Sequence, residues 1–234
     1  MINSKIFFKG LFSIKRLDSP GIALGASFVA IGALLKNIGF TIEESIFSSF
    51  LIYALPGSLV LAESTIIGAS FLNIFLAVWL VNARLYPMTV SLMPLVISKN
   101  QPKWKYYLSC HFLAVSSWLI AKESYKKINA KYRIDFWMGI GTGTWLTAIL
   151  MTVIGYLAAD LLNKEMLIGL AIVNPIYFFC MMIGAMKNLA VSISIILGTI
   201  LGPVIYIFSS EWSLLFAGLI AGSVAFLFGE KNGQ

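Results

Sequence analysis

Long uncharged apolar runs are the feature that most constrains what this chain can fold into. Its charged residues make up only 12% of the sequence and are clustered, which leaves apolar runs of roughly 18 residues or more, enough for a helix to cross about 30 Å of bilayer hydrocarbon. A soluble domain carries about 25% charged residues. Here 59% of the 234 residues are hydrophobic and the mean hydropathy is +0.89. The sequence therefore predicts an all-α polytopic membrane protein.

The apolar runs predict seven or eight transmembrane segments. The candidate spans are 21–35, 46–62, 71–97, 107–121, 136–162, 166–186, 190–208 and 212–228. Two of them are irregular. The 71–97 run is too long for one straight crossing and contains Arg84, Pro87 and Pro94, whereas the 107–121 run is short enough to be re-entrant. We therefore expect some helices to be broken at prolines.

Basic residues give the expected topology. The net charge of +7 lies at the ends of apolar runs and forms no stripe, which excludes nucleic-acid binding as its explanation. The excess of Lys and Arg places the N-terminus and the 122–133 loop in the cytoplasm. Residues 1–19 are expected to form a basic amphipathic segment on the membrane surface, or alternatively a mobile tail. Residues 20–234 are expected to form a single transmembrane domain.

A weak internal similarity predicts a repeat, with halves at about 20–98 and 136–210. Gly25 and Gly141 are 116 positions apart, and Pro56 in one half is matched by Pro175 in the other at a near-equal offset. In transporters built from repeats, helices interrupted at corresponding positions mark the binding site. The direction of one half relative to the other is left open.

Two charged residues stand out inside apolar sequence. Arg84 is the only charge between Ser64 and Ser98, and a guanidinium in hydrocarbon costs at least about 2.5 kcal/mol. It is expected to face a polar cavity, where its planar fork would grip a substrate carboxylate; the alternative is that it reaches a lipid headgroup. Glu63 is a candidate proton site or a partner for Arg84, or else an acid at the membrane interface.

Two proline motifs are candidate helix ends for an anion. Asn174 followed by Pro175 is typical of a helix start, and the YALPGS stretch from Tyr53 through Pro56 and Gly57 to Ser58 predicts a similar break. Free amide groups and the positive dipole end of a helix bind carboxylates. The alternative for each motif is an ordinary proline kink.

Catalytic and metal chemistry find no support in the sequence. The chain has two cysteines and one histidine, His111, with no metal-ligand spacing, and no serine motif that would form a nucleophile with it. The GIGTGTW stretch at residues 139–145 lacks a preceding strand and a following lysine, so we interpret its glycines as helix-packing positions. We expect no enzyme activity, metal or cofactor.

The stretch VNARLYPMTVSLMP at residues 81–94, together with YALPGS, resembles the signature of the AzlC family, the large subunit of branched-chain amino acid exporters. Its most specific part is the set Asn82, Arg84, Pro87 and Pro94. The resemblance covers roughly residues 18–200. It departs at Ser58, where many members carry Gln, and at Lys122 and Glu123, where they carry an acidic pair.

The resemblance implies an inner-membrane exporter of neutral branched-chain amino acids that is driven by an ion gradient and works with a small AzlD-like membrane subunit. We expect the substrate carboxylate at Arg84 and at the helix ends near Pro56 and Pro175. The candidate substrate-binding residues are Tyr53, Pro56, Gly57, Ser58, Asn82, Arg84, Asn174 and Pro175. Glu63 and Glu123 are the candidates for ion or proton coupling. The alternative is a membrane scaffold or regulatory subunit that does not transport, with Arg84 buried against an acid of its partner.

Overall fold

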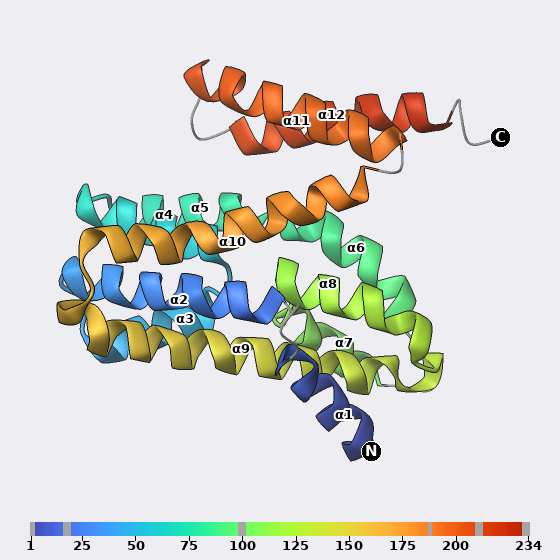
Figure 1. The fold of residues 1–234 in the computed structure, drawn as a ribbon, viewed down its shortest axis with the longest axis horizontal. Coiled ribbons are helices and arrows are strands. Elements are labelled where there is room, and N and C mark those ends of the chain that lie inside the picture. Colours follow the sequence, from blue (N-terminus) through green and yellow to red (C-terminus); the bar gives the residue numbers. More distant parts are fainter. Residues whose placement is uncertain (1–2, 16–19, 98–101, 187–188, 209–212, 231–234) are drawn as a thin grey trace. The chain divides into compact units, whose positions relative to one another are not determined.

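We describe the protein from a computed structural model, which covers residues 3–15, 20–97, 102–186, 189–208 and 213–230. These residues form helices joined by short connections and contain no strand, as the sequence predicts. The chain divides into two compact units, Met1–Asn174 and Pro175–Gln234. Figure 1 shows the helices in chain order.

The first unit holds most of the helices. They are α1 (Ser4–Leu11), α2 (Pro20–Asn37), α3 (Ile42–Leu51), α4 (Leu55–Ile66), α5 (Phe71–Asn82), α6 (Leu85–Val96), α7 (Lys103–Cys110), α8 (Val115–Ser124) and α9 (Arg133–Ala158). Short 3-10 turns join some of them: Phe12–Lys15, Tyr125–Lys127, Ala130–Tyr132 and Ala159–Leu161. Helix α10 (Lys164–Ala185) crosses the division between the units. In the second unit, α11 (Leu189–Phe208) packs on α12 (Ser213–Glu230), with Gly198 facing Ala221.

Helices α2 and α9 run side by side in the same direction (Figure 1). Glycines hold them at backbone contact: a Cβ at Gly32 would overlap the Thr152 carbonyl, and one at Gly155 would overlap the Val29 carbonyl. Such reciprocal glycines are how membrane helices approach closely. Helices α2 and α9 are the first long helices of the two predicted halves. Their parallel direction agrees with a repeat whose halves have the same orientation, and the repeat itself stays a prediction.

The N-terminal segment packs on α9 in the same manner. A Cβ at Gly10 of α1 would overlap the Phe136 carbonyl, and one at Gly139 would overlap the Phe7 carbonyl. The interpretation of the GIGTGTW glycines as packing positions is thus confirmed for Gly139. Helix α1 is therefore part of the first unit's fold, while its expected position at the membrane surface stays a prediction.

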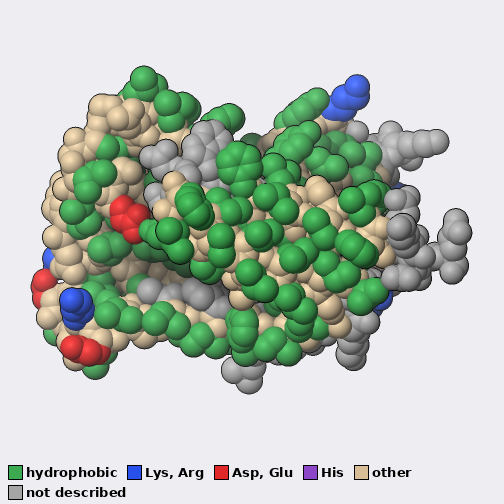
Figure 2. Space-filling view, turned by 90° about the horizontal axis from the view of Figure 1, so that it is seen from above, with side chains coloured by type: hydrophobic (Ala, Val, Ile, Leu, Met, Phe, Trp, Pro, Cys, Tyr) green, Lys and Arg blue, Asp and Glu red, His purple; other side chains and the backbone are tan. Residues whose placement is uncertain are grey.

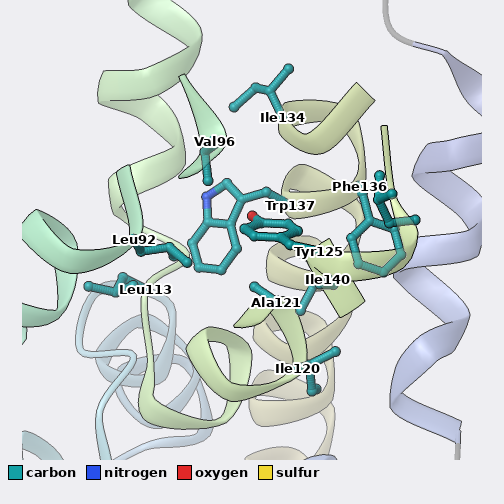
Figure 3. Packing of buried hydrophobic residues seen from close by; sticks show 11 residues of the cluster. Leu92, Val96, Leu113, Ile120, Ala121, Tyr125, Ile134, Phe136, Trp137 and Ile140 are labelled. Atoms are coloured by element: carbon teal, nitrogen blue, oxygen red, sulfur yellow. The ribbon is translucent and has the colours of Figure 1, made fainter. Parts of the chain in front are cut away.

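The largest buried cluster surrounds Trp137 of α9 (Figure 3). Leu92 and Val96 of α6 and Leu113 next to α8 pack near the indole, whose Nε1 donates to the Ser109 carbonyl at 3.2 Å. This cluster joins α6, α8 and α9. It fixes the start of α8, which matters for the site described below.

The structure does not confirm seven or eight spans. Among the described residues, three helices are long and apolar enough to cross a membrane: Pro20–Asn37, Ala130–Leu161 and Leu189–Phe208. Counting α5 and α6, bent by 47° at their junction, as one span gives a fourth. The predicted spans 46–62 and 107–121 each contain a helix break, so no single helix there reaches 18 residues. The face in Figure 2 is mostly hydrophobic with few charges, as lipid-facing helices require.

Candidate functional site

The first helix break lies between α3 and α4, at residues 52–54. Pro56 stands in the first turn of α4 and has no N–H, so the Ile52 carbonyl loses its helical donor. The Ser58 hydroxyl partly replaces it, at 3.4 Å from the Ile52 oxygen and 3.3 Å from the Ala54 oxygen. The helix is interrupted within YALPGS, while the role of Pro56 in causing the interruption stays a prediction.

Two side chains from other elements bind the end of α3. Trp145 of α9 donates its indole N–H to the Phe50 carbonyl at 3.1 Å, and Nε2 of His111 lies 3.1 Å from the same oxygen. The Phe50 and Trp145 rings pack edge to face, with centroids 4.7 Å apart. These two donors replace the amide of Ala54, which a continuous helix would have aimed at the Phe50 carbonyl.

A second break, at residues 111–114, separates α7 from α8. It contains no proline. Its turn is held by Ser117, whose hydroxyl accepts the Ala114 N–H at 2.8 Å and lies 2.8 Å from the Phe112 carbonyl, to which it can donate. The irregularity that the sequence predicted for 107–121 is a helix break.

The two breaks meet inside the first unit. Tyr53 from the first and Ala114 from the second share one buried cluster with residues of α2 and α9. Tyr53 is only 5% exposed, yet its hydroxyl has no hydrogen-bond partner. Its polar neighbours are the Ser117 and Thr144 hydroxyls, which donate to backbone carbonyls of their own segments and keep lone pairs that can accept. A buried hydroxyl without a hydrogen-bond partner in the folded chain is a candidate contact for a polar ligand.

Asn82, at the end of α5, completes the surroundings of the first turn of α4. It packs directly over Gly57, where a Cβ would come within 2.6 Å of the Asn82 Nδ2. The Asn82 Oδ1 is buried and has no hydrogen-bond partner. The structure therefore brings Gly57 and Asn82 together, at the same end of α4 as Pro56, Ser58 and Tyr53.

Arg84 does not pack among the residues described above, and its expected role stays a prediction. It lies in the bend between α5 and α6, its side chain is exposed, and it forms no hydrogen bond or ion pair with the described residues. Glu63 is exposed in the last turn of α4, about 9 Å along the helix from Gly57. The short turn between α4 and α5 makes them antiparallel, which puts Glu63 and Arg84 at opposite ends of this hairpin. The expected pairing of these two residues is wrong for this structure.

The remaining predicted residues are Glu123, Asn174 and Pro175. Glu123 is exposed in the last turn of α8, about 12 Å along the helix from Val115. Asn174 and Pro175 lie inside the continuous helix α10, so the helix start expected there is absent. A proline removes only its own N–H, and a helix can continue through it. Whether these two residues belong to the site stays a prediction.

Sequence reasoning missed four residues of this region: His111, Ser117, Thr144 and Trp145. No motif marks them. The usable signals were an indole N–H inside a predicted span, which needs an acceptor when it is buried, and a lone histidine next to an irregular run. Among the described residues, no group of three His, Cys, Asp or Glu side chains is placed to hold a metal ion.

Two helix breaks that meet inside an apolar domain define a class of protein. In membrane transporters, interrupted helices supply backbone and side-chain polar groups to a substrate at membrane depth. The protein is thus a helical membrane protein with a transporter-type arrangement.

The family model of the AzlC protein matches residues 20–162, which is more than half of the chain and includes both breaks. The chain belongs to the AzlC family, which is associated with branched-chain amino acid transport. No curated protein and no solved structure matches the chain.

Proposed function

We propose that this protein is a secondary transporter that exports neutral branched-chain amino acids across the cytoplasmic membrane, together with a small AzlD-like membrane subunit. Its N-terminus lies in the cytoplasm in this proposal. The observation that carries it is the meeting of the two breaks at Tyr53, with buried polar atoms unpaired on Tyr53 and Asn82. Family membership supports the substrate class.

The substrate in this proposal lies at the first turn of α4. Asn82 offers an unpaired carbonyl oxygen, and the missing side chain of Gly57 lets the Asn82 amide come close to the first turn of α4. The apolar part of the substrate rests on Leu55 and the neighbouring aromatic rings.

Arg84 and the two acids keep proposed roles outside this pocket. Arg84 is exposed two residues beyond Asn82, so its positive charge would attract the substrate carboxylate toward the break. Glu63 and Glu123 are the proposed groups for ion or proton coupling, since both are exposed carboxylates near ends of the broken helices.

An efflux experiment tests the transport function. Cells loaded with labelled valine or leucine should lose it faster when they express the protein and its small subunit. Asn82→Ala should slow efflux about tenfold, because one polar contact to a charged substrate is lost. Asn73→Ala is the matched control, since Asn73 lies exposed near the other end of the same helix. Arg84→Ala should also slow efflux, because the attraction of the substrate carboxylate is lost, without loss of folded protein in the membrane. Normal efflux by Asn82→Ala and Arg84→Ala would refute the proposed site.

A membrane scaffold that does not transport is the second candidate. The observation that favours it is the exposed, unpaired Arg84 at the end of α5, a helix without any buried residue; both features fit a surface that an acid of a partner subunit covers. The scaffold function predicts that Arg84→Ala lowers the amount of the small subunit, and that leucine does not raise the melting temperature of the purified complex.

A further inference from the structure

The start of α8 is the second structural element with unpaired polar groups at the meeting of the breaks. Ala114 precedes the helix with an extended backbone, and no side chain bonds to the amides of the first turn. Ser116 and Ser117 in this turn are buried. Their amides and that of Val115 have no acceptor within the helix, and no hydrogen bond joins them to another described residue.

The Tyr53 hydroxyl lies at this helix start. Ser117, the third residue of α8, and Thr144 of α9 are its polar neighbours, and the hydroxyl itself is buried without a partner. A row of free amides at a helix N-terminus carries a partial positive charge. These amides and a tyrosine O–H can together donate several hydrogen bonds to one carboxylate. Hydrogen bonds to a charged carboxylate are stronger than those to a neutral ligand.

We propose that the substrate carboxylate rests at the N-terminus of α8, held by the first-turn amides and by the Tyr53 hydroxyl. This assignment rests on the proposed transport function and deepens it. It separates two roles: Arg84 attracts the anionic end of the substrate, and α8 holds it. Asn82, which packs on the first turn of α4, remains a second polar contact for the substrate.

The test compares two ligands that differ only in this group. Binding of L-leucine and of L-leucinamide, which lacks the carboxylate, is measured on the purified full-length chain with its small subunit. The wild-type protein should bind leucine about tenfold or more tightly than leucinamide, since hydrogen bonds to a charged group are the stronger ones. Tyr53→Phe keeps the ring and removes only the O–H. It should weaken leucine binding about tenfold and leucinamide binding clearly less, because an O–H bonds a charged carboxylate more strongly than a neutral amide carbonyl.

A second pair of variants examines the amides without touching Tyr53. Val115→Pro removes one first-turn N–H at the helix position where proline is best tolerated, and Val115→Ala is its control for the lost side chain. Selective loss of leucine binding in Val115→Pro supports the assignment.

The outcomes separate this assignment from the transport function. Equal weakening of both ligands by Tyr53→Phe, or selective loss in Arg84→Gln but not in Tyr53→Phe and Val115→Pro, would overturn the assignment and leave transport standing. Absence of any leucine binding by the wild-type complex would overturn both.

Discussion

The first unit contains two kinds of helix that use the same support, α9. Helix α2 is continuous and touches α9 backbone to backbone through Gly32 and Gly155. The broken helix α3/α4 meets α9 through side chains instead: Ser49 and Thr152 share a hydrogen bond of 2.8 Å, and Trp145 binds the Phe50 carbonyl. The backbone contact between α2 and α9 is thus fixed, whereas the side-chain contacts between α3 and α9 can adjust.

The difference has a physical origin. A glycine contact between two backbones fits one register only, because neither backbone can turn aside to relieve an overlap. A hydrogen bond from a rotatable side chain can lengthen, or be exchanged, at a cost of about 1 kcal/mol. We therefore expect α2 and α9 to act as the rigid frame, and the broken helices to be the part that rearranges during transport.

The largest effect is expected from Gly155→Ala. The new Cβ would overlap the Val29 carbonyl, a backbone atom, so the helices must separate and the free energy of unfolding should fall by about 3 kcal/mol. Gly25→Ala is the control in the same helix pair, because its Cβ would meet only side chains, the flexible Met151 at 3.4 Å and Thr147 at 3.8 Å. Thermal unfolding of the purified protein measures both. Equal stability of the two variants would contradict the glycine contact.

The next effect concerns the Phe50 carbonyl. Trp145→Phe or His111→Ala each leaves one donor on it, whereas the double variant leaves none. Phe50 is exposed on the helix surface, but in a membrane no water replaces a lost donor, so a backbone carbonyl without a partner stays unsatisfied there. The double variant should therefore lose about 1–2 kcal/mol more than the sum of the singles. A double-mutant cycle on stability and on efflux measures this term. His111→Gln, which keeps a donor, should rescue the histidine variant; strict additivity would show that the two donors do not share one function.

A small effect on stability is expected from the ion pair that joins α2 to the segment after α9. Lys36 of α2 and Asp160 after α9 form an ion pair of 2.6 Å, but their side chains are 29% and 78% exposed. Exposed ion pairs contribute about 0–1 kcal/mol. Lys36→Met should therefore change the melting temperature little, and any change should shrink as salt is added. A loss comparable to that of Gly155→Ala would mean that the charges, and not the glycines, hold the frame.

The fold class could be predicted from local sequence, and so could an irregularity near each of the two breaks. A long apolar run predicts a spanning helix because backbone groups in lipid must bond within their own helix. The missing N–H of Pro56 is likewise a local property. The break at His111 has no such mark beyond the irregular 107–121 run. It depends on Ser117 and on packing around Ala114, which only the folded chain brings together.

The position of Arg84 could not be predicted for a related reason. Sequence shows that a guanidinium stands in apolar surroundings, but its exposure depends on the bend between α5 and α6 and on what covers α5. Pairing with Glu63 seemed favourable because both charges are isolated in the sequence. The antiparallel α4/α5 hairpin places them at opposite ends, and hairpin register is a property of packing rather than of composition.

The smallest effect is expected at the proline that does not break its helix. Pro175→Ala gives α10 an amide that can bond to the Ala171 carbonyl, so the helix stays continuous and efflux should remain unchanged. Pro56→Ala is the comparison: its new amide competes with Ser58 for the Ile52 carbonyl, which favours closing the break and should slow efflux several-fold. Efflux of labelled leucine measures both. If Pro175→Ala slows efflux as much as Pro56→Ala does, α10 opens at Asn174 during transport and the predicted repeat of broken helices is correct.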